Sequence, residues 1–428
     1  LSILLSLLLP AQPSRSPDCG GILTPAGLSY FAEVSKPHTE AVLRRQLVAD
    51  PDLSQSSSKP SRNSIASVNV SELSLSLVPH AGLRLSIDAD LGISSAPSAT
   101  RVKRLSILAD LHVEMNLEGN MELVTSSCKP TLEGTQSSSE EVESKSSSSE
   151  LDKISVDKVC LEVSKLLLSP NERLISLTTQ FPVTASCQAQ YVPLAVPMFS
   201  EQGIIISLQT TFQVAGIPIP LPVSPVPFSM PEPASSSSSH LTLAFSEHFY
   251  TSLFFALEIA GAFNMTLLSP LTTRTVAQRI PQVGSLFQED VPVVLQAVFR
   301  SSPRVQLEEG KAALRLFLTV HVGAGAAGFQ SFLSVSVVSV PRECARCAPG
   351  VWGAELSLAA SDVGSVPAAA LRELLLPTVQ REVPAQLNEV LSEGIFLPHV
   401  SGFTYTDVAV AIHRDYVLVP CNLQLQER

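Results

Sequence analysis

Apolar and polar side chains alternate along three long segments of the N-terminal half, and this pattern predicts β-strands. The alternation covers residues 68–77, 83–93 and 105–117. One buried and one solvated face is typical of an antiparallel sheet. The offset near Ser71 in the first segment predicts a β-bulge. The length of the segments indicates a strongly bent or coiled sheet rather than a flat one.

Two helical patterns flank these strands. Residues 24–47 open with Thr24 as a cap and Pro25 in the first turn, and their apolar positions then recur every three residues. Pro37 lies inside this pattern, so we expect the helix to kink or split there. A second helix is predicted over residues 151–168, after a serine- and glutamate-rich loop at 136–150. Strand-like segments follow at residues 174–183 and 203–214.

The C-terminal half repeats this order. Residues 240–263 predict an apolar helix, and residues 366–393 a longer helix that we expect to break at Pro377 and Pro384. Alternating segments predict strands at 293–299, 314–322, 332–340, 404–412 and 416–425. The shared order indicates two copies of one α+β unit.

A proline-rich segment divides the two halves. Residues 217–239, IPIPLPVSPVPFSMPEPASSSSS, can form neither a helix nor a central strand, because proline fixes φ and lacks an N–H donor. We therefore expect an extended, semi-rigid backbone that braces the two halves. Only the serine-rich end of the segment is expected to be mobile. The length of 428 residues suits two domains. We predict domains at 19–216 and 240–428, with 217–239 as the linker.

The N-terminus and the cysteines predict a secreted protein. Residues 1–18 begin LSILLSLLLPAQ, which is typical of the end of a signal peptide, and no later stretch is apolar enough to span a bilayer. Asn69 and Asn264 are glycosylation acceptors by sequence. Seven cysteines suit an oxidising compartment. Sequence alone leaves the pairing of five of them open, namely Cys19, Cys187, Cys344, Cys347 and Cys421.

Composition and motifs argue against several functions. The net charge of −11 and the pI near 5.3 argue against a nucleic-acid partner and against strong attraction to anionic membrane surfaces. The hydrophobic content of 45% with only 16% charged residues indicates an unusually apolar globular chain. Cys344 and Cys347 have CxxC spacing, but a zinc site would need two further ligands at similar spacing. No catalytic, cofactor-binding or metal-binding motif occurs, so we predict a protein without enzymatic activity, cofactor or metal.

Three features together carry a family resemblance. They are the opening GGILTPAGLSYFAEVSKP, the cysteines at 128 and 160 on either side of the acidic loop, and the central proline segment. In these the sequence resembles the lipid-binding family of bactericidal/permeability-increasing protein, lipopolysaccharide-binding protein and cholesteryl ester transfer protein. The acidic charge and residues 341–352, PRECARCAPGVW, depart from the family pattern.

The resemblance implies a fold and a disulfide. It implies an α+β boomerang of two tandem tubular barrels, each a coiled antiparallel sheet wrapped on long helices, joined by the linker and a central sheet. It also implies a disulfide between Cys128 and Cys160 and apolar pockets that hold acyl chains. The expected partners are phospholipids or fatty acyl chains, with lipopolysaccharide as a further possibility.

Two candidate sites have two interpretations each. The stripe Phe245, Phe249, Leu253 and Leu257 either lines a lipid pocket or packs a helix on a sheet. The cluster Arg101, Lys103 and Arg104 is either an anion patch or a solvated strand end, and the negative net charge favours the second. We therefore predict a lipid-binding protein. The alternative is an innate-defence protein that binds lipopolysaccharide or the bacterial envelope.

Overall fold

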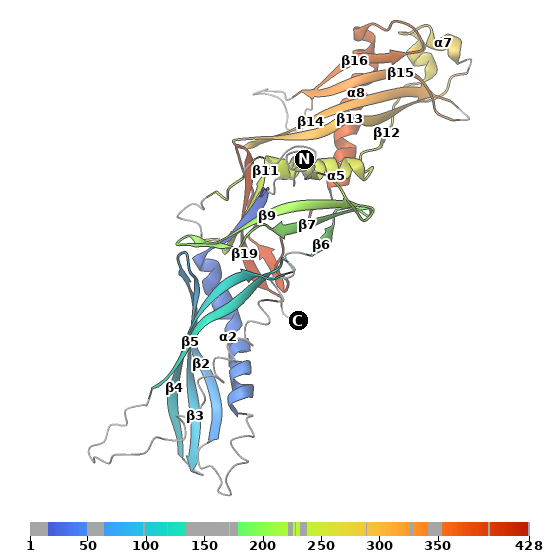
Figure 1. The fold of residues 1–428 in the computed structure, drawn as a ribbon. Coiled ribbons are helices and arrows are strands. Elements are labelled where there is room, and N and C mark those ends of the chain that lie inside the picture. Colours follow the sequence, from blue (N-terminus) through green and yellow to red (C-terminus); the bar gives the residue numbers. More distant parts are fainter. Residues whose placement is uncertain are drawn as a thin grey trace, which may run out of the picture.

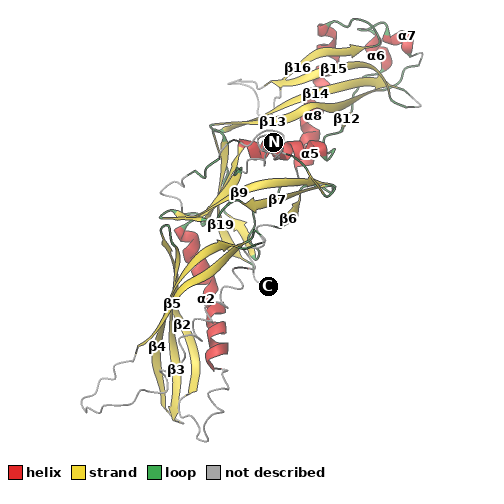
Figure 2. Ribbon diagram, in the orientation of Figure 1, coloured by secondary structure: helices red, strands yellow, loops and turns green. Residues whose placement is uncertain are grey.

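The structure is a computed structural model with three antiparallel sheets arranged along an elongated molecule (Figure 1). A four-stranded sheet lies at one end, a five-stranded sheet at the other, and a ten-stranded sheet between them. Helices lie against both outer sheets, and strands predominate throughout (Figure 2). The described residues are 16–48, 64–96, 99–117, 119–133, 171, 179–220, 226, 228–231, 238–287, 289–325, 328–340, 353–392 and 394–426.

The N-terminal sheet consists of the predicted long strands and one more. Its order is β2 (Ser64–Val78), β3 (Gly82–Ala96), β4 (Ala99–Met115) and β5 (Met121–Glu133). The predicted bulge is confirmed, because the β2–β3 register shifts between Val70 and Glu72. Every second side chain over residues 83–91 of β3 and 105–111 of β4 is aliphatic and buried. These side chains form one wall of the N-terminal core, as the alternating pattern predicts.

Helix α2 (Pro25–Val48) lies along this sheet and is continuous, so the predicted split at Pro37 is wrong. Proline removes a single N–H donor, and the helix is held on both sides of it. Leu28 and Leu43, one on each side of Pro37, are both buried in the N-terminal core. The Thr39 hydroxyl also donates to the Ser35 carbonyl at 3.0 Å.

The C-terminal sheet is built in the same way. Its order is β12 (Met265–Leu267), β13 (Val293–Glu308), β14 (Lys311–Ala324), β15 (Gln330–Val340) and β16 (Gly353–Ser361). Helix α8 (Ala368–Leu391) packs on it without the predicted breaks. A buried side chain at every fourth position from Leu371 to Leu387 holds α8 on the core, while Pro377 lies on its exposed side. Two short helices, α6 (Thr273–Ala277) and α7 (Val283–Leu286), lie between β12 and β13.

The predicted helix over residues 240–263 is wrong in its first part. Leu241–Ser246 forms strand β11, and helix α5 runs only over Glu247–Ile259. The apolar positions at 241, 243 and 245 alternate with period two, which is the pattern of a strand. Ser246 then caps the helix, since its side chain accepts the Phe249 N–H at 3.2 Å.

The central sheet joins both halves of the chain. Strand β1 (Cys19–Leu23) is hydrogen-bonded between β9 (Gly203–Val214) and β11, and β11 pairs in turn with β19 (Tyr416–Leu425). A central sheet is thus present, as the family resemblance implied. The remaining strands are β6 (Gln180–Pro182), β7 (Cys187–Pro193), β8 (Met198–Ser200), β10 (Ile217–Pro218), β17 (Phe403–Thr406) and β18 (Ala411–His413).

Several predicted features lie outside the described residues. They include residues 1–15 of the predicted signal peptide, the helix predicted at 151–168, and Cys160, Cys344 and Cys347. The linker is described at 217–220, 226, 228–231 and 238–239, where β10 pairs with the end of β9. Within the described ranges, no helix combines the length and the apolarity that a membrane span requires.

Candidate functional site

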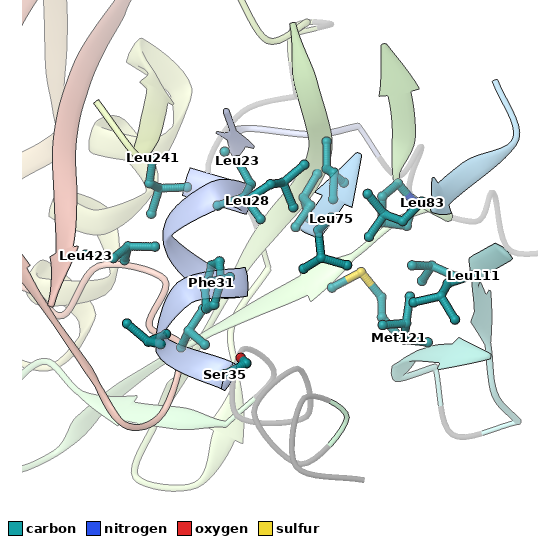
Figure 3. Close-up of a pocket in the computed structure, with 18 of the residues that line it drawn as sticks. Leu23, Leu28, Phe31, Ser35, Leu75, Leu83, Leu111, Met121, Leu241 and Leu423 are labelled. Atoms are coloured by element: carbon teal, nitrogen blue, oxygen red, sulfur yellow. The ribbon is translucent and has the colours of Figure 1, made fainter. Parts of the chain in front are cut away.

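An apolar cavity of about 380 Å³ lies where helix α2 and the N-terminal sheet meet the central sheet (Figure 3). Its walls come from β1, α2, all four N-terminal strands, β9, β11 and the segment 398–425. The lining is mostly aliphatic: Leu23, Leu28, Phe31, Val34, Leu73, Leu75, Leu83, Leu85, Ile87, Leu111, Val113, Met121, Leu123, Ile204, Ile206, Leu208, Leu241, Leu243, Val400, Leu423 and Leu425.

Strand and helix periodicity explain how these side chains converge. Along β3, Leu83, Leu85 and Ile87 point to one face because strand side chains alternate. Along α2, Leu28, Phe31 and Ser35 recur every three to four positions, which places them on one side of the helix. The cavity therefore lies between the buried face of the sheet and the inner stripe of the helix.

The C-terminal segment closes the cavity from the central side. Pro398, Tyr405 and Leu423 line it, and the Tyr405 hydroxyl donates a short hydrogen bond to the Pro398 carbonyl. Burial raises the pKa of Tyr405, which keeps its phenol neutral. Sequence reasoning missed this wall, since nothing local in the sequence links residues 398–425 to helix α2.

A cluster around His240 fixes that wall to helix α2. The His240 ring stacks on Tyr30 with centroids 4.7 Å apart, and its Nδ1 accepts the Leu423 N–H at 3.1 Å. The Thr24 hydroxyl donates to the Ser239 carbonyl at 2.6 Å. These contacts bring the N-terminal helix, the end of the linker and the last strand together at one place.

Polar groups are few in the cavity. Besides Tyr405, helix α2 supplies Ser35, His38 and Thr39, and the Thr39 hydroxyl already donates to a backbone carbonyl. Among the lining residues that the structure describes, none is Asp, Glu, Lys or Arg. An apolar ligand would be stabilised by about 0.8 kcal/mol for each methylene it buries. The arrangement suits binding of a hydrocarbon chain, and among the described lining residues no side-chain hydrogen bond joins a hydroxyl to a histidine.

The four residues predicted to line a pocket lie elsewhere. Phe245, Phe249, Leu253 and Leu257 are buried in the C-terminal core, and none of them lines this cavity. The rings of Phe245 and Phe249 pack with centroids 4.8 Å apart. These contacts pack helix α5 on the sheet, and a lipid pocket lined by these four residues stays a prediction.

The predicted basic cluster is partly neutralised. Arg104 Nη2 lies 2.9 Å from Asp88 Oδ2, and Arg104 stands opposite Asp90 in the sheet. A hydrogen bond from Ser106, together with Arg104, holds the pKa of Asp88 below its ordinary value. Lys103 is half-buried, and the side chain of Arg101 lies outside the described residues. An anion patch here stays a prediction, with one of its three cations already paired.

The cysteines divide into two groups. Cys128, on β5, is disulfide-bonded, but its predicted partner Cys160 lies outside the described residues, so the pairing stays a prediction. Cys19, Cys187 and Cys421 are buried and free. Burial raises the pKa of both Cys187 and Cys421 to about 11, which keeps these thiols protonated.

Both predicted glycosylation acceptors are exposed. Asn69 lies on β2 and Asn264 just before β12, and each is accessible to solvent. Exposure is what an N-linked glycan requires, so both positions stay open as predictions.

A buried carboxyl group lies at the seam between the halves. Asp18 is 1% exposed, and its Oδ1 accepts hydrogen bonds from the N–H and hydroxyl of Thr210 at 2.9 and 3.1 Å. Its Oδ2 has no partner among the described residues. Burial raises the pKa of Asp18 to about 6. No basic residue forms an ion pair with it within the described part of the chain.

Comparison with known proteins places the molecule among relatives. Residues 352–425 match the C-terminal domain of the LBP / BPI / CETP family. The chain is 59% identical over 441 residues to Protein TENP of Gallus gallus, covering 100% of this chain and 99% of that protein. It is 27% identical over 452 residues to BPI fold-containing family B member 2 of Homo sapiens, covering 100% and 98%.

A solved structure shares the fold. The crystal structure of a lipopolysaccharide binding protein matches with a TM-score of 0.52 at 16% identity, covering 96% of this chain and 100% of that one. At 16% identity, the match shows only that the two proteins share the arrangement of sheets and helices.

Proposed function

The chain belongs to the LBP/BPI/CETP family, and we propose that it is a secreted, non-enzymatic lipid-binding protein that holds an acyl chain in the cavity of its N-terminal half. The observation that carries this proposal is the composition of the cavity walls. Aliphatic side chains from three parts of the chain converge there, and the described lining has no Asp, Glu, Lys or Arg.

The physical argument concerns hydrocarbon burial. Each methylene transferred from water into the cavity contributes about 0.8 kcal/mol, so a long acyl chain can be held without a charged clamp. Ser35 and His38 lie on helix α2 among these lining residues. They provide the polar side chains toward which a headgroup can be oriented.

The finer form of the proposal has two barrels. Each outer sheet with its helix would form one tubular unit, joined by the linker at 217–239, and each unit would hold lipid. The N-terminal cavity supports the first site. In the C-terminal half, Phe249, Phe254 and Phe263 are buried between helix and sheet, so the second site has less support.

The alternative, binding of lipopolysaccharide at the predicted basic cluster, has weaker support. Arg104 is paired with Asp88, and the chain carries a net charge of −11. Recognition of several phosphates would require cations that are free to pair with them. Two features support the proposed secretion. The predicted N-glycosylation acceptors Asn69 and Asn264 are exposed, and Cys128 is disulfide-bonded.

The decisive experiment is analysis of the bound lipid. Protein purified from its native source is extracted with organic solvent, and the extract is analysed by mass spectrometry. We expect acyl lipid at a defined ratio to protein, and uptake of a fluorescent fatty acid after delipidation. Protein that is lipid-free as isolated and takes up no fatty acid would overturn the proposal. Binding only to lipopolysaccharide at low ionic strength would favour the alternative.

A further inference from the structure

A second hollow, of about 680 Å³ and polar in lining, lies at the hairpin between β13 and β14, away from the apolar cavity. Four cationic side chains line it: Arg304, Lys311, Arg315 and Arg414. The first three belong to the hairpin, and Arg414 lies in the turn between β18 and β19. The hairpin is fixed to β18 because the Gly310 N–H donates to the Ile412 carbonyl at 2.9 Å.

Two of these cations face each other directly. Arg304 on β13 is the register partner of Arg315 on β14, and both are exposed. Opposed side chains in an antiparallel pair have Cβ atoms about 5 Å apart, so like charges there destabilise the sheet. The register of β13 shifts between Ser301 and Arg304, which marks an irregularity that re-aims side chains. Two positively charged residues are thus placed opposite each other in the sheet, which costs some stability locally.

The acidic side chains of the hollow are mostly committed to other partners. Glu247 Oε2 accepts the Leu307 N–H at 2.9 Å, and Glu309 lies 3.1 Å from His413 Nδ1. Glu308 accepts from the Gln306 side chain at 3.4 Å. Asp415 also lines the hollow.

The cations, by contrast, lack acceptors. Neither Arg304 nor Arg315 has an ion pair or a side-chain hydrogen bond with any residue that the structure describes, and the same holds for Lys311 and Arg414. The hollow therefore presents several N–H donors close together, and no side chain among the described residues accepts a hydrogen bond from them.

We propose that the Arg304–Arg315 pair binds a phosphate group, as free phosphate, a soluble phosphate ester or a lipid headgroup. Guanidinium groups present N–H donors in a planar fork that matches phosphate oxygens, and two of them can hold one phosphate from both sides. A bound phosphate would remove the repulsion between the two arginines. Lys311 and Arg414 supply further positive charge at the edge. This site is independent of the proposed lipid cavity.

The test uses full-length protein and inorganic phosphate. Titration calorimetry at low ionic strength should detect binding to the wild type, and Arg304→Gln and Arg315→Gln should each weaken it at least tenfold. Arg300→Gln is the matched control, because Arg300 is an exposed arginine on the same strand outside the hollow. The affinity of Arg300→Gln for phosphate should stay within twofold of the wild-type affinity. Failure of the wild type to bind, or equal loss in the control, would overturn the proposal.

Charge reversal separates binding from folding. In Arg315→Glu, Arg304 gains an opposite charge as its cross-strand partner, so we expect a higher Tm together with loss of phosphate binding. A lower Tm in this variant would contradict the repulsion on which the site is argued. Vesicles of phosphatidylcholine with and without phosphatidic acid identify the source of the phosphate. Arginine-dependent sedimentation with acidic vesicles indicates a lipid headgroup, whereas binding of free phosphate alone indicates a soluble ester.

Discussion

The hydroxyl of Tyr30 accepts the backbone N–H of Leu425 at 2.9 Å, across a separation of 395 residues. Tyr30 belongs to helix α2, and Leu425 is the last residue of strand β19. Leu425 lines the apolar cavity, and the same tyrosine ring stacks on His240. One side chain thus ties the C-terminal wall of the cavity to the N-terminal helix.

Removing this hydroxyl should loosen the wall. Tyr30→Phe leaves the Leu425 N–H without its acceptor, so we expect a loss of about 1 kcal/mol in the free energy of unfolding. Urea denaturation measures it. Fatty-acid exchange should become faster, since the wall opens more readily. Tyr416→Phe, on the same strand outside the cavity, is the control and should leave the exchange rate unchanged.

Filling the cavity should weaken the binding of lipid. Leu75 lies on β2 among the lining residues (Figure 3). Leu75→Trp places a larger side chain where an acyl chain would lie, so affinity for a fluorescent fatty acid should fall at least tenfold. Val298→Trp, on an exposed position of β13, should bind as the wild type does. Unchanged affinity in Leu75→Trp would place the ligand elsewhere.

The stripe on α5 can be tested by truncation. Phe249 is 1% exposed and packs against Phe245 and Tyr250. If its role is packing, Phe249→Ala should cost about 3–5 kcal/mol of stability, as large-to-small core substitutions do. Lipid content per folded molecule should then stay constant. A fall in bound lipid with little loss of stability would instead support the interpretation that this stripe lines a lipid pocket.

Asp18 should make stability depend on pH. Its pKa in the folded protein, about 6, lies above the ordinary 3.8, so the protonated form is favoured by folding. This contribution is full below pH 3.8 and is lost as the pH rises through 6. Between pH 4 and pH 7.5 the wild type should therefore lose about 2 kcal/mol relative to Asp18→Asn.

Urea denaturation of both proteins at several pH values measures this difference. Other carboxyl groups titrate in both proteins and cancel in the comparison. A stability difference that stays constant across this range would show that Asp18 does not titrate as expected.

The three free cysteines should be protected in the native protein. Cys19, Cys187 and Cys421 are buried, and each thiol has a raised pKa because of its burial. Iodoacetamide followed by peptide mapping should therefore label them only after denaturation. Recovery of disulfide-linked peptides that contain any of the three would contradict the structure.

Local periodicity predicted much of the fold. The strand-like segment predicted at residues 203–214 is strand β9 with the same bounds, and the offset near Ser71 is the observed bulge. The helix breaks expected at Pro37, Pro377 and Pro384 are absent, because tertiary packing on both sides of each proline holds the helix together. Strand β11 was missed since its short alternation runs directly into an apolar helix.

The cavity was less predictable than the fold. The alternating pattern predicted that the aliphatic side chains of these strands are buried. It does not show whether they pack directly against a helix or line a cavity. Its C-terminal wall depends on contacts between residues some 395 positions apart, such as Tyr30 and Leu425. Only three-dimensional placement brings these segments together.

The position of β1 has a consequence for how the chain is made. This strand is among the first described residues, yet both of its hydrogen-bonding neighbours, β9 and β11, are synthesised about two hundred residues later. A nascent chain must therefore keep residues 19–23 unpaired until the second half has begun to emerge from the ribosome, and closing so long a loop slows folding. The N-terminal half expressed by itself would leave the β11-facing edge of β1 open, and the C-terminal half would leave the β1-facing edge of β11 open, so each half would be exposed to aggregation.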